Sequence, residues 1–393
     1  MLRRTCIAAL ALASATLAAP AARAADIDIG LLGQFSGPYS WWGKEYKRGI
    51  ELWLDANGGG KVGAHTLKVL ERDEGGTNPQ RSRQLAQELV VRDKVQYLLG
   101  GTFTPTVLGV TDIANQAKTP FVVLNSGTSM VTTRSPYFVR VGFTQWTVSV
   151  PLVQYAVEQG VKNAAILVAD FAPGHDGLEA YGKTFTKLGG TVAGEIKVPL
   201  GTTDFSSYLQ RVRDLKPQAV FMFMPVGPMS AGFVKAWKER ELDKAGITLY
   251  ATTETMESDL PAIGDSALGL ITALHYGPYV DNAQNKTFVA AYKAKYGKDE
   301  VPSIASVAAW DGMRLIAEMV RATNGAADGD KALAAAKGFK WDSPRGAVSI
   351  DAKTREIVNN VYIRRVEKID GQLGNKPFKT YPAVKEPWHE LNP

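Results

Sequence analysis

The chain has 393 residues, of which 45 are lysine or arginine and 39 are aspartate or glutamate, giving a formal net charge of +6. This excess is small and dispersed, which excludes the strongly basic surface of a nucleic-acid-binding protein, so we expect no nucleic-acid partner. Cys6 is the only cysteine, which excludes internal disulfides, so an apolar core must stabilise the protein.

The first 24 residues have the pattern of a secretory signal peptide. Arg3 and Arg4 precede an apolar run over residues 7–17, and Ala22-Arg23-Ala24 is a small-x-small cleavage site. A membrane anchor is the alternative, but the run falls short of the ~20 apolar residues that span a bilayer. We therefore expect cleavage after about Ala24 and a periplasmic mature protein. Without the three leader arginines its net charge is 42 minus 39, or +3.

Apolar runs typical of strands alternate with segments typical of helices throughout the mature chain. This alternation predicts an α/β fold with parallel sheets covered by helices. The chain exceeds what one core usually serves, and a second set of units begins near Val148, so we expect two Rossmann-like lobes. The expected strands are 27–32, 67–71, 96–99, 121–124, 164–168, 192–198, 219–224 and 248–251. The expected helices are 43–57, 78–92, 107–116, 147–159, 177–188, 205–215, 230–240 and 285–296.

The loops that follow the strands are the candidate ligand site, because the carboxyl ends of parallel strands face the cleft between such lobes. The loop after Leu32 carries four aromatic residues, among them Trp41 and Trp42, just before a helix. Aromatic rings at this position either stack on a planar or apolar ligand or fill the core. We expect at least one tryptophan to contact the ligand.

Two later loops of the first half are rich in hydroxyl groups. Residues 102–106 and 125–129 place Ser and Thr side chains and backbone N–H groups beside the start of a helix. Such an arrangement suits a carboxylate or another anionic group. Ser and Thr also cap helices without any ligand, but two such loops converging on one cleft favour ligand binding.

The second half supplies the loops that would face them across the cleft. These loops contain Phe171, Pro225, Val226 and Glu254. Glu254 is the one acid there that could pair with a ligand ammonium group, although an acid in a loop is more often solvated.

Several motifs of catalysis and metal binding fail in their context. Gly58-x-Gly60-x-x-Gly63 resembles a dinucleotide fingerprint, yet it follows an expected helix instead of opening one. The four histidines lack metal-ligand spacing, and we find no nucleophile elbow and no Walker loop. We expect no catalytic residue, no metal and no cofactor.

A set of short motifs in a characteristic order resembles the type I periplasmic binding proteins of the branched-chain amino acid ABC transporter class. The motifs are Ile29-Gly30, Ser36-Gly37-Pro38, Arg72-Asp73, Leu98-Leu99-Gly100-Gly101, Ser135-Pro136-Tyr137-Phe138-Val139-Arg140 and Gly264-Asp265-Ser266-Ala267-Leu268-Gly269. The resemblance covers the whole mature chain. Within the class, Ala172-Pro173-Gly174-His175-Asp176, His275-Tyr276, Lys337-Gly338-Phe339-Lys340-Trp341 and Asp342-Ser343-Pro344-Arg345-Gly346 resemble a subgroup associated with aromatic carboxylates.

The resemblance implies which residues bind the ligand. It places carboxylate-binding hydroxyls at Thr104 and at Thr128 or Ser129, and an aromatic lid at Trp42. Our predicted ligand-binding set is Trp42, Thr104, Gly127, Thr128, Ser129, Phe171, Pro225, Val226 and Glu254.

The implied contacts to a ligand ammonium group are incomplete. Amino acid binders of the class hold it with an acid and aromatic hydroxyls, whereas this chain has Phe171 and Val226 at the aromatic positions. A buried ammonium without partners costs several kcal/mol. We therefore expect a small carboxylate ligand, preferably an aromatic or related organic acid, with a branched-chain or other amino acid as the alternative.

The resemblance also implies two lobes joined by a three-segment hinge near residues 142–147, 274–279 and 338–343. Lobe one would comprise 25–143 plus 277–337, and lobe two 144–276 plus 338–393. Ligand binding would close the hinge, and the closed form, which we expect to be a monomer, would dock an ABC transporter permease in the inner membrane. A ligand-sensing receptor subunit would use the same fold and cleft.

Overall fold

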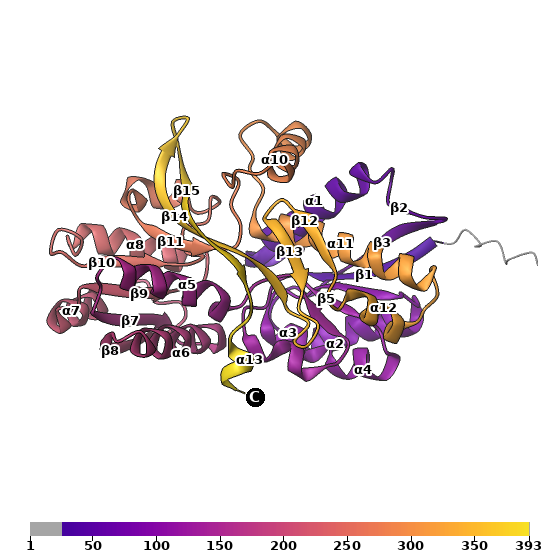
Figure 1. Ribbon diagram of the computed structural model, residues 1–393, viewed down its shortest axis with the longest axis horizontal. Helices are drawn as coiled ribbons and strands as arrows, with labels where there is room; N and C mark the ends of the chain where they lie inside the picture. The colour runs from indigo at the N-terminus through magenta and orange to yellow at the C-terminus, as the bar shows by residue number, and fades with distance from the viewer. Residues whose placement is uncertain (1–25, 393) are drawn as a thin grey trace, which may run out of the picture.

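The computed structural model describes residues 26–392, and the predicted signal peptide, residues 1–24, lies outside them. Two sheets with helices packed against them lie side by side along the long axis of the molecule (Figure 1). The strands are β1 Asp26–Gly33, β2 Lys61–Val62, β3 His65–Asp73, β4 Tyr97–Gly100, β5 Phe121–Val123, β6 Phe138–Arg140, β7 Asn163–Ala169, β8 Thr191–Val198, β9 Ala219–Phe223, β10 Thr248–Ala251, β11 Ile271–Leu274, β12 Lys340–Ser343, β13 Gly346–Ile350, β14 Ile357–Ile369 and β15 Gln372–Val384.

The helices connect these strands and cover the sheets. They are α1 Ser40–Ala56, α2 Pro79–Gln87, α3 Thr104–Gly109, α4 Thr111–Ala117, α5 Gln145–Glu158, α6 Ala172–Lys187, α7 Ser206–Leu215, α8 Pro228–Glu239, α9 Leu260–Ile263, α10 Ala283–Tyr296, α11 Ile304–Thr323, α12 Gly329–Ala336 and α13 Trp388–Leu391. Shorter turns are η1 Gly37–Tyr39, η2 Glu88–Arg92, η3 Ser129–Arg134 and η4 Gly264–Ala267.

The first sheet has the order β2-β3-β1-β4-β5-β6, and all of its strands but β2 run parallel. Its central strands β4 and β5 are continuous apolar runs that are buried throughout, as strands covered on both faces require. Leu98 and Leu99 are neighbours on β4 that point to opposite faces, and both are fully buried. Because β1, β4 and β5 run parallel, their carboxyl ends lie at the same edge of the sheet, where the loops of the predicted site begin.

The second sheet has parallel strands in the order β11-β10-β9-β7-β8, extended by the antiparallel pair β14 and β15. Successive residues of β7 alternate between two cores, with Leu167 in one and Ile166 in the other. This period of two is what a sheet covered on both faces demands. The predicted α/β fold with two Rossmann-like sheets is confirmed, and the antiparallel C-terminal strands are an addition to it.

The C-terminal segment differs from the expected lobe division. Trp341, Val348, Ile350 and Ile357, from β12, β13 and the start of β14, pack in the core of the first sheet. In Figure 1 β14 then runs on to the second sheet, where it pairs with β11. The chain therefore crosses within β14, later than the expected crossing near 338–343.

Two buried arginines hold the crossing segments together. Arg345 donates from Nη1 to the carbonyl of Val141 in the first crossing, at 3.0 Å. Arg364, on β14, donates from Nη1 to the carbonyl of Tyr276 in the second, at 3.1 Å. Arg345 also pairs with Asp311 of α11 at 2.8 Å, with both side chains fully buried. The buried guanidiniums thus join backbone segments that are far apart in sequence.

We predict that Arg345→Met costs about 3 kcal/mol of unfolding free energy, because it leaves the Asp311 carboxylate buried without its cation. Urea denaturation followed by circular dichroism measures the loss. Adding Asp311→Asn should recover part of it, since the uncompensated charge is then gone. Lys244→Met, in an exposed pair with Glu241, is the control and should leave the midpoint unchanged. A single Arg345 variant as stable as the wild type would contradict this role.

Candidate functional site

The loops after β4 and β5 meet through their hydroxyl groups. Thr104 opens α3, and its Oγ1 lies 2.9 Å from Oγ1 of Thr128 in the neighbouring loop. Ser126 donates to the same Thr104 oxygen at 3.1 Å. All three side chains are buried. The structure thus brings together two of the predicted residues, Thr104 and Thr128, and adds Ser126 to them.

Arg140, the last residue of β6, holds the second of these loops from beneath. Its Nη1 donates to the carbonyls of Thr128, at 2.8 Å, and Ser126, and its Nη2 donates to that of Ser129 at 3.3 Å. Its charge is balanced by Glu356, which accepts from Nε at 2.7 Å and from Nη2 at 2.6 Å. Burial alone would raise the pKa of Glu356, but Arg140 holds it below its ordinary value.

The backbone N–H groups of the two loops are available as donors. Across residues 26–392, the N–H groups of Thr104 and Thr128 have no hydrogen-bond acceptor in the protein. Because Arg140 binds the carbonyls of the Ser126–Ser129 loop, it limits the orientations that the intervening peptide units can take. Donor groups next to buried hydroxyls form the kind of site that a carboxylate fills.

Ser129 differs from the other predicted residues because both of its donors are occupied. Its N–H donates to Oδ2 of Asp176 on α6 at 2.7 Å, and its hydroxyl donates to Glu386 near the C-terminus at 2.7 Å. Burial raises the pKa of Asp176. Ser129 therefore links the loop of the first sheet to α6 of the second. The sequence contains Asp176 in a loop of interest, but no local pattern identifies its partner.

The second sheet contributes an apolar wall. Phe171 precedes α6 and stacks on Phe223 at the end of β9, with ring centroids 5.9 Å apart and planes 15° apart. Pro225 and Val226 follow β9 and are half-buried. Gly127, from the first sheet, lies close to the hinge, because a Cβ placed on it would be 3.9 Å from the ring of Phe143.

The predicted aromatic lid belongs to a cluster that joins the two halves. Trp42 meets Trp41 edge to face with centroids 5.2 Å apart, and both pack with Val226 against this interlobe cluster. The interlobe cluster consists of Leu52, Phe143, Val148, Met256, Leu274, Tyr276, Phe288, Tyr292, Ile304 and Val307. Trp42 and Val226 thus approach the same apolar surface from opposite halves.

The carboxyl group of Glu254 binds the backbone of lobe two. Oε1 accepts from the N–H of Met224 at 2.8 Å and Oε2 from the N–H of Thr252 at 2.5 Å. The side chain is fully buried, and this burial raises its pKa to about 7 against the opposing effect of the backbone donors. Glu254 therefore ties the loop after β9 to the loop after β10, and two of its acceptor positions are already used.

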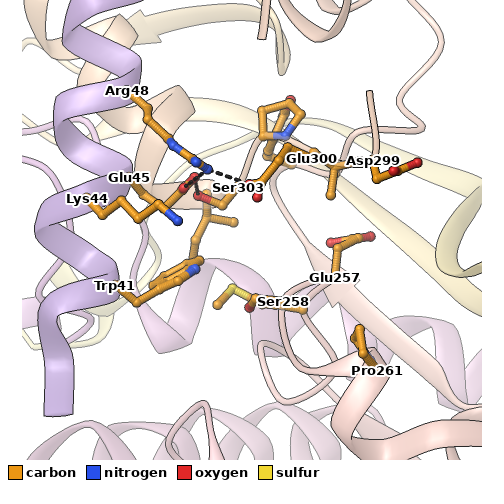
Figure 2. A pocket seen from close by; sticks show the side chains of 16 residues that line it. Trp41, Lys44, Glu45, Arg48, Glu257, Ser258, Pro261, Asp299, Glu300 and Ser303 are labelled. Atoms are coloured by element: carbon orange, nitrogen blue, oxygen red, sulfur yellow. Dashed lines mark hydrogen bonds and ion pairs between the residues drawn. The ribbon is translucent and has the colours of Figure 1, made fainter. Parts of the chain in front are cut away.

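A cavity of about 260 Å³ lies between the halves, on the Trp41 side of α1. Figure 2 shows Lys44, Glu45 and Arg48 on α1 facing Glu257 across it, with Asp299 and Glu300 near its upper rim. None of the nine predicted residues lines this cavity. Its side chains include four acids, Glu45, Glu257, Asp299 and Glu300, which makes it a poor site for a carboxylate.

The described part of the chain contains neither a candidate membrane-spanning helix nor a candidate metal cluster. No helix within residues 26–392 is both long enough and apolar enough to cross a membrane. In the same residues, no group of three or more His, Cys, Asp and Glu side chains is arranged to hold a metal ion.

Comparison with known proteins gives consistent matches over nearly the whole chain. Residues 26–372 match the family model described as periplasmic binding protein. A Leu/Ile/Val-binding protein homolog 6 of Brucella melitensis is 44% identical over 383 residues, which cover 97% of this chain and 98% of the relative.

Two solved structures are similar in both sequence and fold. A solute-binding protein of an ABC transporter from Rhodopseudomonas palustris HaA2, in complex with p-hydroxybenzoic acid, has a TM-score of 0.89 and 44% identity over 94% of this chain and 100% of its own. Another from R. palustris BisB5, in complex with 3,4-dihydroxybenzoic acid, has a TM-score of 0.86 and 41% identity over 93% and 99%.

The raised pKa of Glu254 predicts a pH dependence of stability. The folded protein keeps the proton up to about pH 7 and the unfolded chain only up to its ordinary 4.5, so the unfolding free energy falls as pH rises between these values. This decline is on the order of 3 kcal/mol, and Glu254→Gln should lack it. Urea denaturation at several pH values from 4.5 to 8 gives the unfolding free energy of each variant as a function of pH. Glu239→Gln, at an exposed position of α8, is the control. Parallel wild-type and Glu254→Gln curves would contradict the prediction.

Proposed function

The chain belongs to the periplasmic binding protein family, and on that premise we propose that it captures an aromatic carboxylate, such as a hydroxybenzoate, between its two lobes for an ABC importer. The observation that carries this proposal is the meeting of the loops after β4 and β5, the second of them held by Arg140, because their N–H groups and hydroxyls suit a carboxylate. The acids bound in the two R. palustris structures support the same ligand class.

The lobe-one loops suit the acid group of such a ligand. Thr104 and Thr128 each offer an N–H that is free within the described chain, and because their hydroxyls share one hydrogen bond, one O–H is left to donate. Hydrogen bonds to a charged oxygen contribute about 1.5–3 kcal/mol each. The donors are already placed, because Arg140 orders the Thr128 loop and the hydroxyls of Thr128 and Ser126 bond that of Thr104. Such preorganisation reduces the cost of binding.

The lobe-two wall suits an aromatic body better than an amino acid. Phe171 and Phe223 present stacked rings, and Val226 is apolar. Trp42, at the lobe-one side, contributes a further aromatic surface. An ammonium group would need a free acid here, whereas the carboxylate of Glu254 already accepts two backbone hydrogen bonds. Burying an ammonium without a partner is costly.

Closure would bring the two walls together. Lobes joined by crossing segments move as hinged bodies around a ligand, and the Ser129–Asp176 bond is a contact that opening would break. The closed protein would then deliver its ligand, as a monomer, to an inner-membrane permease. Cleavage after about Ala24 would release it into the periplasm.

A branched-chain amino acid is the second candidate ligand, because the Brucella relative is named a Leu/Ile/Val-binding protein homolog. The two ligand classes share a carboxylate and an apolar body. They differ in the ammonium group, which makes them separable by experiment.

We predict that benzoate and 4-hydroxybenzoate raise the melting temperature, whereas leucine and 4-hydroxybenzyl alcohol do not. Leucine brings an unpartnered ammonium, and the alcohol lacks the carboxylate. A ligand at ~100 times its dissociation constant adds about 2.7 kcal/mol to the unfolding free energy, which thermal-shift measurements detect. Stabilisation by leucine alone would overturn the proposed ligand class, and stabilisation by the alcohol would overturn the role of the carboxylate.

Thr104→Val should weaken 4-hydroxybenzoate binding about tenfold or more, because it removes one hydroxyl that faces the carboxylate while nearly preserving side-chain volume. Isothermal titration calorimetry gives the dissociation constants. Thr203→Val, the same substitution at an exposed position of lobe two, is the control. An unchanged dissociation constant in Thr104→Val would remove this hydroxyl from the site.

A further inference from the structure

Gln145 is a buried polar residue between the two lobes for which the proposed carboxylate site has no use. It is the first residue of α5, within the expected first crossing segment, and only 1% of it is exposed. Its N–H donates to the carbonyl of Gly127 at 3.0 Å, which fixes the residue against the Ser126–Ser129 loop. Its side-chain Oε1 is buried without a hydrogen-bond partner.

The side chain of Gln145 spans from one lobe to the other. A Cβ placed on Gly127 would lie 3.7 Å from Gln145 Nε2, and a Cβ placed on Gly177 of α6 would lie 3.9 Å from Oε1. The amide nitrogen therefore lies beside the Ser126–Ser129 loop of lobe one, and the amide oxygen lies beside α6 of lobe two. Both neighbours are glycines, so no side chain from either position covers the amide.

Gly177 lies between the unpaired oxygen and two aromatic residues of lobe two. The same Cβ position on Gly177 is 3.7 Å from Cβ of Phe223 and 3.8 Å from Cε2 of Tyr181. Phe223 stacks on Phe171, and the Tyr181 hydroxyl is already used, since it donates to the carbonyl of Met222 at 3.0 Å. Oε1 of Gln145, a buried acceptor without a partner among the described residues, thus borders the same Gly177 position as Phe223 and Tyr181.

A buried acceptor without a partner costs about 1–3 kcal/mol, and a native protein usually retains such a group for a reason. An aromatic acid whose carboxylate lies on the Thr104 and Thr128 loops would direct its ring toward lobe two. A hydroxyl on that ring is a donor, and it would satisfy the amide oxygen. A ring that carries only hydrogen would leave the oxygen unpaired.

We propose that Gln145 selects ring-hydroxylated aromatic acids, by accepting a hydrogen bond from a phenolic hydroxyl of the bound ligand. This inference rests on the proposed function, because it assumes that an aromatic acid occupies the cleft. It goes further in assigning the chemical group that lobe two recognises and the residue that recognises it.

The first test uses the wild-type protein alone. Calorimetry with 4-hydroxybenzoate, benzoate and 4-fluorobenzoate should give the hydroxylated acid an affinity about tenfold or more above the other two, which cannot donate. The 2- and 3-hydroxy isomers show which ring position meets the amide. Equal affinities for all these acids would overturn the role of Gln145 while leaving the proposed function intact. Failure of every aromatic acid to bind would overturn both.

The second test assigns the preference to the residue. Gln145→Met keeps the length of the side chain but removes the acceptor, so it should lower 4-hydroxybenzoate affinity about tenfold and leave benzoate affinity within about twofold. Gln159→Met, the same change at the exposed end of α5, is the control. An unchanged ratio of the two affinities, or an equal loss of both, would show that Gln145 does not read the hydroxyl.

Discussion

The buried pair of Arg140 and Glu356 is the interaction on which the site depends. Arg140 ends β6, yet its guanidinium binds the carbonyls of the loop that follows β5. A guanidinium offers five donors in a fixed plane, and here two kinds of acceptor use them: the carboxylate of Glu356 and three backbone carbonyls. The pair therefore satisfies its own charges and also fixes the orientation of the loop.

The same chemistry recurs at the hinge. Arg345 and Arg364 bind carbonyls of the first and second crossing segments, and both come from the C-terminal part of the chain. A charged donor that binds a carbonyl forms a stronger bond than a neutral one, and burial removes competition from water. The first and second crossing segments, which must bend when the lobes move, are thus held at the carbonyls of Val141 and Tyr276. Bending is therefore confined to the backbone on either side of these two points.

The local patterns of the sequence predict most of the fold but only part of the site. Most strands of the two parallel sheets follow from apolar periodicity, although β6 and β11 are not among the expected strands. The loops that contain Thr104 and Thr128 follow from their place after buried strands, whereas the two residues themselves are what the family resemblance implies. The antiparallel strands β14 and β15 form a hairpin around Asp370-Gly371, a turn that local patterns can predict, but the pairing of β14 with β11 joins segments about 90 residues apart and has no local signal.

Ser129 and Glu254 show what sequence reasoning about the site cannot anticipate. Each has the residue type that the ligand would need, but each is engaged by a long-range partner. Ser129 bonds Glu386, which is 257 residues away, and Glu254 bonds the backbone of a loop 30 residues earlier. A single sequence carries no signal for such pairs. Gln145 is the converse case, since only its lack of a partner in the fold draws attention to it.

The division of chemistry between the lobes has a consequence for closure. A ligand shifts an equilibrium only through contacts that differ between the two states. The carboxylate donors on lobe one are present whether the lobes are open or closed, so they contribute affinity without favouring closure. Closure must depend on what lobe two adds, which is an aromatic wall, the acceptor proposed at Gln145 and the Asp176 carboxylate that accepts from the Ser129 N–H. Asp176 is on α6 of lobe two, and its carboxylate contacts the Ser126–Ser129 loop that would hold the ligand acid. Closure would therefore bring two acidic groups toward one set of donors. The ring contacts must outweigh that repulsion, which favours ligands with a large apolar surface over small acids.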